Sequence, residues 1–136
     1  MISYDELGML LDEIAAELPE DLYRELNGGV VLLPDIKLHP ESNETDNLYI
    51  LGQYHNQPLG LGRYITIYYG SLMRVYPNHS PANLKEELKK VIFHEFFHHL
   101  ESLAGERSLE IKDAEDLAKY KLRFRMNKEQ KNRRDE

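Results

Sequence analysis

The sequence predicts a single α+β domain in which a small, mostly antiparallel or mixed sheet packs against a long helix. Its 136 residues suit one domain with its own hydrophobic core. Apolar residues recur at helical spacing near the N-terminus and again in the later part of the chain, and short β-branched runs lie between these regions. This order of elements favours a sheet that helices cover on one face.

The composition excludes several classes of protein. The chain has no cysteine, which excludes disulfides and thiolate metal sites and is typical of a reducing compartment. Its net charge of −7 disfavours binding to nucleic-acid phosphates. No apolar run approaches the roughly 20 residues that span a membrane, and the start MISYDEL lacks the basic region of a signal peptide. We therefore expect a cytoplasmic protein with no nucleic-acid or membrane partner; the sequence leaves its oligomeric state open.

The first helix begins at a capping box that Ser3 and Glu6 form. Apolar residues then recur at helical spacing: Leu7, Leu10, Leu11, Ile14 and Leu18. Pro19 ends this helix because proline disrupts a helical backbone. A short helical segment from Asp21 to Leu26 follows, and the NGG triplet at 27–29 marks a turn.

Three strands are predicted in the middle of the chain: Val30–Leu33, Leu48–Gln53 and Ile65–Tyr69. The polar stretch Pro34–Asn47 contains two prolines and reads as a loop. The segment YHNQPLGLGRY, which precedes the third strand, suits a hairpin or a mobile loop.

The main helix has clear start signals, because Ser80 can cap it and Pro81 suits its first position. At about 100° per residue, one apolar stripe forms along it from Ile92, Phe96, Leu100 and Leu103. His94, His98 and Glu101 lie on roughly the opposite side. One face should therefore pack on the core while the other carries polar chemistry.

Gly105 is the expected end of this helix. A last helix is expected from near Asp113 to Phe124, and almost all residues from Met126 onward are charged or carry an amide. We therefore place one domain at 1–125 and a charged tail at 126–136.

Residues 94–98 read HEFFH, which is the most informative motif of the chain. Residues four apart on a helix share a face, so His94 and His98 can direct both imidazoles at one zinc ion, about 2.0–2.1 Å from each nitrogen. Glu95 then lies beside the metal, where it can act on a metal-bound water. The alternative is a charged helix that carries these residues by chance; the helical setting and the apolar neighbours Phe93 and Phe97 favour the zinc site.

The third zinc ligand is less certain from spacing. Glu101 lies on the correct face, but the helix rise leaves its carboxylate short by roughly 2 Å, which suits a carboxylate that orients a histidine. The chain must turn back before another ligand can approach, which leaves four acidic candidates: Glu106, Glu110, Asp113 and Asp116. We favour Asp113, then Glu110, then Glu101. His99 leaves the shared face and either binds substrate or packs.

From Leu48 to Leu117 the chain resembles the small bacterial zincin-like metallopeptidases, also called minigluzincins or Asp-zincin-like proteins. The resemblance rests on LGQY with PLG shortly after it, on ITIYYGSL, and on ELKKVIFHEFFHHLESLAGE. It implies a minimal zincin fold, one zinc ion on His94 and His98, and Glu95 as the catalytic carboxylate.

The chain departs from the pattern of this family after the second histidine. Many relatives carry a glycine three residues later and an aspartate three further on, where this chain has Glu101 and Ala104. The aspartate ligand therefore does not transfer by position. Either an inserted turn moves this role to Glu110 or Asp113, or the site is built differently.

The predicted function is zinc-dependent hydrolysis of a peptide or protein, with Glu95 as the general base. Two alternatives are a zinc-binding protein without activity that contacts a protein partner, and an interaction domain without metal. Tyrosines 64, 68 and 69 suit sheet packing, or one of their hydroxyls stabilises an oxyanion. The strand Ile65–Tyr69 is our candidate for an edge that pairs with an extended peptide.

Overall fold

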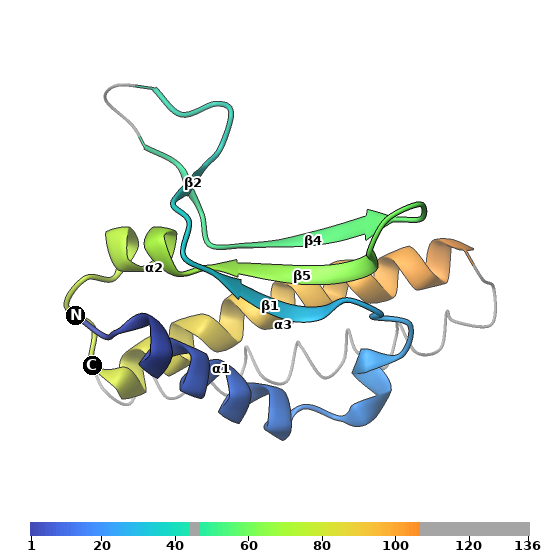
Figure 1. The fold of residues 1–136 in the computed structure, drawn as a ribbon, viewed down its shortest axis with the longest axis horizontal. Helices are drawn as coiled ribbons and strands as arrows, with labels where there is room; N and C mark the ends of the chain where they lie inside the picture. Colours follow the sequence, from blue (N-terminus) through green and yellow to red (C-terminus); the bar gives the residue numbers. More distant parts are fainter. Residues whose placement is uncertain (44–46, 107–136) are drawn as a thin grey trace, which may run out of the picture.

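Helices cover one side of a small sheet in the computed structural model, which describes residues 1–43 and 47–106 (Figure 1). In chain order the elements are α1 (Tyr4–Glu17), the 3-10 helix η1 (Glu20–Tyr23), β1 (Gly29–Leu33), β2 (Lys37–Leu38), β3 (Tyr49–Ile50), β4 (Gly52–Gln57), β5 (Gly62–Tyr68), α2 (Tyr69–Val75) and α3 (Pro81–Glu106). This architecture confirms the predicted α+β class. The predicted helix 113–124 and the tail 126–136 lie outside the described residues.

The main sheet is mixed and has the strand order β1-β5-β4. β1 pairs with β5 in parallel, and β4 pairs with β5 antiparallel through the predicted hairpin. The prediction that Ile65–Tyr69 forms a free edge is wrong, because β5 is the central strand. The backbone N–H of Tyr68 donates to Leu51 on one side of β5, and the carbonyl of Arg63 accepts from Gly28 on the other. β4 is the edge strand that contacts α3.

The two faces of β5 differ in chemistry because successive side chains alternate across a strand. Ile65 and Ile67 are fully buried in the same apolar cluster as Phe96 of α3. On the other face, the hydroxyl of Tyr68 donates to Gln53 Oε1 over 2.9 Å. The helix layer therefore rests on the isoleucine face of the sheet, while the tyrosine face forms polar contacts between strands.

Local capping signals place the starts of both long helices. Ser3 Oγ accepts from the backbone N–H of Glu6, and the Glu6 carboxylate accepts from the backbone N–H of Ser3, which completes the predicted capping box. At the start of α3, Ser80 Oγ accepts from the N–H of Asn83 over 3.2 Å. Both predicted helix starts are confirmed.

The predicted strand Leu48–Gln53 is divided between β3 and β4, which belong to different sheets, and two further elements, β2 and α2, were not predicted. The predicted loop 34–47 contains β2, which pairs with β3 to form an arm that projects from the body (Figure 1). The predicted third strand ends one residue early, and α2 begins at Tyr69. Ser71 of α2 links α2 to β2. Its hydroxyl accepts a hydrogen bond from the N–H of Lys37 over 2.7 Å and donates one to the carbonyl of Lys37 over 3.2 Å. Such a long-range contact leaves no local sequence pattern.

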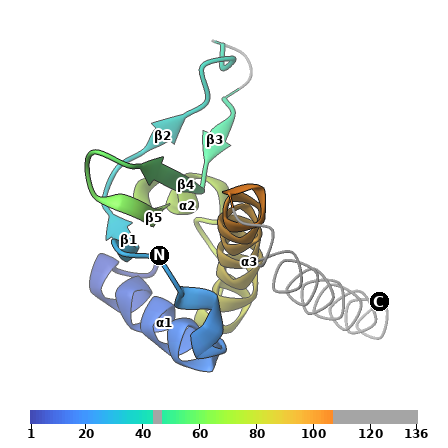
Figure 2. The same ribbon diagram turned by 90° about the vertical axis from the view of Figure 1, so that its right-hand side faces the viewer.

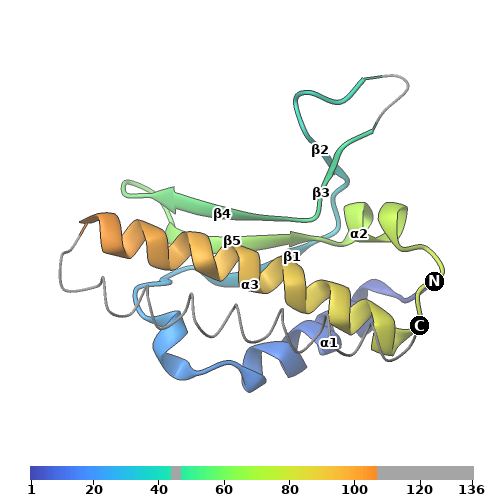
Figure 3. The same cartoon turned by 180° about the vertical axis from the view of Figure 1, so that it is seen from behind.

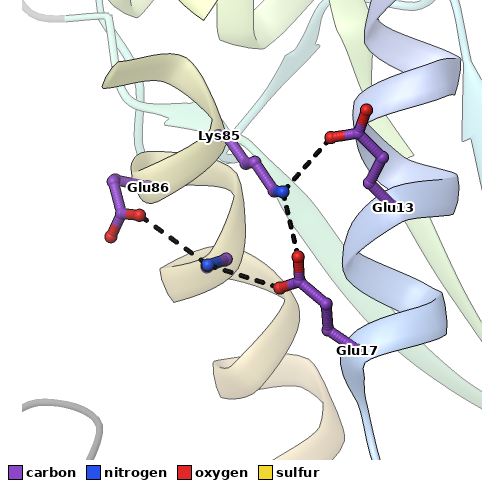
Figure 4. A network of polar contacts seen from close by, with 5 residues as sticks. Glu13, Glu17, Lys85 and Glu86 are labelled. Atoms are coloured by element: carbon purple, nitrogen blue, oxygen red, sulfur yellow. Dashed lines mark hydrogen bonds and ion pairs between the residues drawn. The ribbon is translucent and has the colours of Figure 1, made fainter. Parts of the chain in front are cut away.

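Ion pairs connect the exposed sides of α1 and α3 (Figure 4). Lys85 Nζ lies 3.2 Å from Glu13 Oε2 and 3.0 Å from Glu17 Oε1, and Lys89 Nζ lies 3.4 Å from Glu17 Oε2. The hydrogen bond from Lys85 lowers the pKa of the Glu17 carboxyl. Exposed pairs contribute little each, so the apolar residues beneath them supply most of the stability of this contact.

Gly52 allows β4 to lie close to α3. A Cβ atom at this position would stand 2.7 Å from Val91 Cγ1 and 3.1 Å from Ile67 Cδ1. In Figure 2, β4 lies next to α3, and β1 lies next to α1. The absence of a side chain at Gly52 therefore sets the spacing between the edge strand and the long helix.

Within residues 1–43 and 47–106, no helix combines the length and the apolar character that crossing a membrane requires. α3, the longest of the described helices, carries charged residues along its whole length.

We expect Gly52→Ala to lower the free energy of unfolding by about 1–3 kcal/mol, because the added methyl group overpacks the contact with Val91. Urea denaturation would measure the change. The matched control is Gly8→Ala in α1, where the new Cβ would meet only Leu32 Cδ2 at 3.8 Å and alanine favours the helix. Equal stability of the Gly52→Ala variant and the wild type would contradict this account of the strand spacing.

Candidate metal centre

The apolar stripe of α3 orients the HEFFH motif. Ile92, Phe96, Leu100 and Leu103 are all buried in the core, as predicted. The helix therefore presents His94 and His98 on its exposed side, next to the edge strand β4. Figure 3 shows α3 running the length of the sheet beneath β4 and β5.

The two motif histidines turn their rings toward each other. Their Nε2 atoms lie 3.1 Å apart, and the rings meet edge to face with centroids 4.5 Å apart. Two nitrogens bound to one tetrahedral zinc ion at about 2.0–2.1 Å would be separated by about 3.3 Å. The observed separation differs little from that value, so the pair fits a shared metal ion with little movement.

Glu101 contacts the other nitrogen of His98. Its Oε1 lies 3.3 Å from His98 Nδ1, while His98 Nε2 faces His94. This is the position from which a carboxylate orients a metal-binding imidazole through its second ring nitrogen. Glu101 therefore lies beside the candidate site. It contacts Nδ1 of His98, whereas His94 contacts Nε2.

A groove lies between β4 and α3 in front of these histidines. It consists of two adjoining cavities of about 650 and 360 Å³, which share Ile50, Gly52, His94 and Glu95. The larger cavity extends along Gln53, Tyr54, His98, Glu101 and Ser102. The smaller cavity extends along Leu51, Lys90 and Val91. The histidine pair therefore borders an open groove.

Glu95 occupies the centre of this groove. It is only 6% exposed, and it lines both cavities directly beside His94. Glu95 follows His94 in the sequence and contributes to the lining of both cavities. The structure thus brings together three of the predicted site residues: His94, Glu95 and His98.

His99 does not reach the groove, which decides between the two roles predicted for it. It is fully buried, with Nε2 2.8 Å from the carbonyl of Arg24 and Nδ1 2.9 Å from the hydroxyl of Tyr54. A carbonyl can only accept, so Nε2 carries the proton and Nδ1 accepts from Tyr54. Burial is the main cause that lowers the pKa of His99. These contacts support the packing role, and His99 lines neither cavity of the groove.

Tyr54 is one of the groove residues that the sequence analysis did not assign to the site. It lines the larger cavity, and its hydroxyl is held by His99. Two residues after Tyr54 in the sequence, the side-chain Nδ2 of Asn56 donates a hydrogen bond to Ser102 Oγ of α3 over 3.2 Å. The alternation of β4 side chains could have indicated this face, but the sequence does not show which face of the strand meets α3.

Tyr64, Tyr68 and Tyr69 do not line either cavity of this groove. Tyr64 stacks on His55 with ring centroids 4.4 Å apart, Tyr68 bonds to Gln53, and the hydroxyl of Tyr69 donates to the carbonyl of Ile2. These contacts favour the packing role over the oxyanion role for all three.

No complete set of three metal ligands is found among the residues that the structure describes. Within residues 1–43 and 47–106, no three His, Asp or Glu side chains converge as a group that could hold a metal ion. Three of the candidates, Glu110, Asp113 and Asp116, lie outside these residues, and the side chain of Glu106 is not described either. The described part of the site thus consists of two nitrogen donors and one adjacent carboxylate.

A solved structure resembles this chain. It is that of a conserved hypothetical protein from Thermus thermophilus, with 33% sequence identity and a TM-score of 0.65 over 77% of this chain and 100% of that one. The present chain belongs to the same family. No protein-family model and no curated protein matches the chain. The likeness supports the α+β fold, and the printed description of that protein names no activity.

We expect the free energy of unfolding to fall as the pH is lowered from about 7.5 to about 5.5, and to fall less in His99→Gln. Burial holds the pKa of His99 below that of the unfolded chain, so the unfolded chain binds a proton that the folded chain excludes. A glutamine can still donate to Arg24 and accept from Tyr54, but it does not titrate.

Urea denaturation in the presence of EDTA at several pH values would test this expectation without a contribution from bound metal. His79→Gln, which removes an exposed histidine, is the control and should retain the wild-type pH dependence. If His99→Gln and wild type showed the same pH dependence, burial of a neutral His99 would be refuted.

Proposed function

We propose that the protein is a zinc-dependent metallopeptidase of the zincin-like type, which hydrolyses a peptide bond. The observation that carries this proposal is the 3.1 Å separation of His94 Nε2 and His98 Nε2 beside Glu95 in an open groove. Neutral imidazole nitrogens are common zinc ligands, and a glutamate next to such a pair suits a general base.

His94 and His98 would hold the metal, and the third ligand would come from the segment after α3. Asp113 is our first choice for it, and Glu110 is the second. Glu101 is a weaker choice, because its carboxylate contacts the outer nitrogen of His98. When bound, zinc would supply Lewis-acid chemistry and lower the pKa of a coordinated water to about 7.

Glu95 would act as the proton carrier of the reaction. Its carboxylate would accept a proton from the attacking water and pass it to the nitrogen of the leaving amine. Its position at the junction of the two cavities puts it beside any chain that runs through the groove. Glu101 would keep His98 in the orientation that directs Nε2 toward the metal.

β4 would bind the substrate by backbone pairing, in place of the strand first expected to do so. It is an edge strand, and it forms one wall of the groove through Gly52, Gln53 and Tyr54. An extended peptide that pairs with this edge would pass directly in front of His94 and Glu95.

The principal alternative is a zinc-binding protein without activity that acts through a protein partner. A structural zinc site has four protein ligands, whereas a catalytic site keeps one position open for water. The open groove beside the histidine pair favours the catalytic reading.

We expect the purified wild-type chain to bind about one zinc ion, and the His94→Ala/His98→Ala double variant to bind none, because two ligands are lost. Element analysis after dialysis would measure the zinc content. The matched control is the double variant His39→Ala/His79→Ala, which removes two other exposed histidines. Equal zinc content in all three proteins would remove the basis of the proposed metal site.

We expect Glu95→Gln to retain zinc and to cleave peptides about 10²- to 10⁴-fold more slowly than wild type, because the amide is a poor proton acceptor. Mass spectrometry of a peptide mixture would measure cleavage. Glu86→Gln, on the same helix and outside the groove, is the charge-matched control and should remain active. Zinc binding without any cleavage by the wild type would favour the non-enzymatic alternative.

A further inference from the structure

We infer that Asn27 is a site of spontaneous deamidation, and that the hydrogen bond between the N–H of Gly28 and the carbonyl of Arg63 controls its rate. The site lies in the turn between η1 and β1 and includes none of the residues of the candidate metal centre. The inference follows from the residue after Asn27, from the bonding of its backbone nitrogen, and from the close packing of the turn on β5.

Asn27 is the asparagine of this chain whose sequence setting most favours deamidation. It precedes Gly28, whereas every other asparagine precedes a residue with a side chain. The reaction needs the backbone nitrogen of the next residue to approach the asparagine side chain, and glycine has no Cβ atom to hinder that approach. The side chain of Asn27 is also exposed, so water can reach it.

The fold requires glycine at position 28. A Cβ atom there would stand 2.6 Å from Tyr64 Cβ and 3.2 Å from Tyr64 Cγ, both on the central strand β5. The side chain of Asn27 lies beside Gly62 of the same strand, since a Cβ atom at Gly62 would stand 3.4 Å from Asn27 Oδ1. The close packing of the turn on β5 therefore retains the reactive Asn–Gly pair.

Deamidation of this pair needs no reagent other than water. The backbone nitrogen of Gly28 gives up its proton and forms a bond to Cγ of Asn27, while the bond from Cγ to Nδ2 breaks and ammonia leaves with the proton. The cyclic succinimide then adds water at either of its carbonyls. The product is aspartate or isoaspartate, and no group is oxidised or reduced.

The native structure restrains the nitrogen that must react. The N–H of Gly28 donates to the carbonyl of Arg63 over 2.9 Å, and the N–H of Gly29 donates to the carbonyl of Leu26 over 3.1 Å. An N–H that donates a hydrogen bond gives up its proton less readily, and this bond also holds the nitrogen against β5. The reaction therefore requires the turn to open locally, as hydrogen exchange of a backbone amide does.

The modification would weaken the connection of this turn to the rest of the fold. Isoaspartate adds a carbon atom to the backbone between residues 27 and 28, which displaces the N–H of Gly28 from the carbonyl of Arg63. The segment before the turn carries the carbonyl of Arg24, to which the buried His99 donates over 2.8 Å. We therefore expect the deamidated chain to be less stable than the unmodified chain.

Mass spectrometry of the peptide that contains residue 27 would follow deamidation of the full chain at mildly alkaline pH. We expect wild type in buffer to react at least about tenfold more slowly than wild type unfolded in guanidinium chloride, where the hydrogen bond of Gly28 is absent. Asn27→Ser should show no change in the mass of this peptide. Hydrogen exchange of the Gly28 N–H, measured by NMR, should be slowed to a similar degree, because both reactions need the same opening.

Gly29→Ala would test the control that the turn exerts. Gly29 has a φ of +67°, which alanine adopts only with strain, and no atom lies within 4 Å of the new Cβ. The variant should deamidate about fivefold faster than wild type in buffer, because strain favours the open turn. In guanidinium chloride the two rates should be equal, because the Asn–Gly pair is unchanged. Gly8→Ala in α1 is the matched control and should keep the wild-type rate in buffer.

An Asn27 that stays intact in the unfolded chain would refute the modification site. Equal rates for wild type in buffer and in guanidinium chloride, or equal rates for Gly29→Ala and wild type in buffer, would refute the control by the hydrogen bond. Circular dichroism would show whether Gly29→Ala is folded. The comparison of folded and unfolded wild type decides the question even if that variant does not fold.

Discussion

The close packing of β4 on α3 determines the shape of the groove and the position of each side chain around it. Gly52 makes this contact possible, since a Cβ atom there would overlap with Val91. The strand backbone can therefore lie directly against the helix, which brings Tyr54 over His99. The edge of β4 then borders the same groove as His94 and Glu95, so one packing contact brings the strand and helix walls of the groove together.

Two adjacent histidines of α3 have opposite environments because successive helical residues point about 100° apart. His98 is exposed, and its two nitrogens face His94 and Glu101. His99 is fully buried, and its two nitrogens connect β4 to the segment after η1. One helix thus combines an open pair of nitrogen donors with a buried hydrogen-bonded link, and the buried link holds the wall of the groove in place.

Fold and function rest on different observations in this protein. The structural relative from Thermus thermophilus supports the architecture and the family, and a shared architecture by itself does not imply an activity. The proposal of zinc chemistry depends on the geometry of His94, Glu95 and His98, and His94 and Glu95 lie where the two cavities of the groove between β4 and α3 meet.

Local sequence signals were sufficient where the structural cause lies within about one helical turn. The capping box of Ser3, the start of α3 at Pro81 and the common face of His94 and His98 all depend on such short spacings. The tertiary structure alone decided that β5 is central, that Ser71 holds β2, and that Tyr54 bonds to a histidine 45 residues away. Strand order and groove composition depend on contacts between distant residues, and alternation along a strand does not specify which neighbour each face will meet.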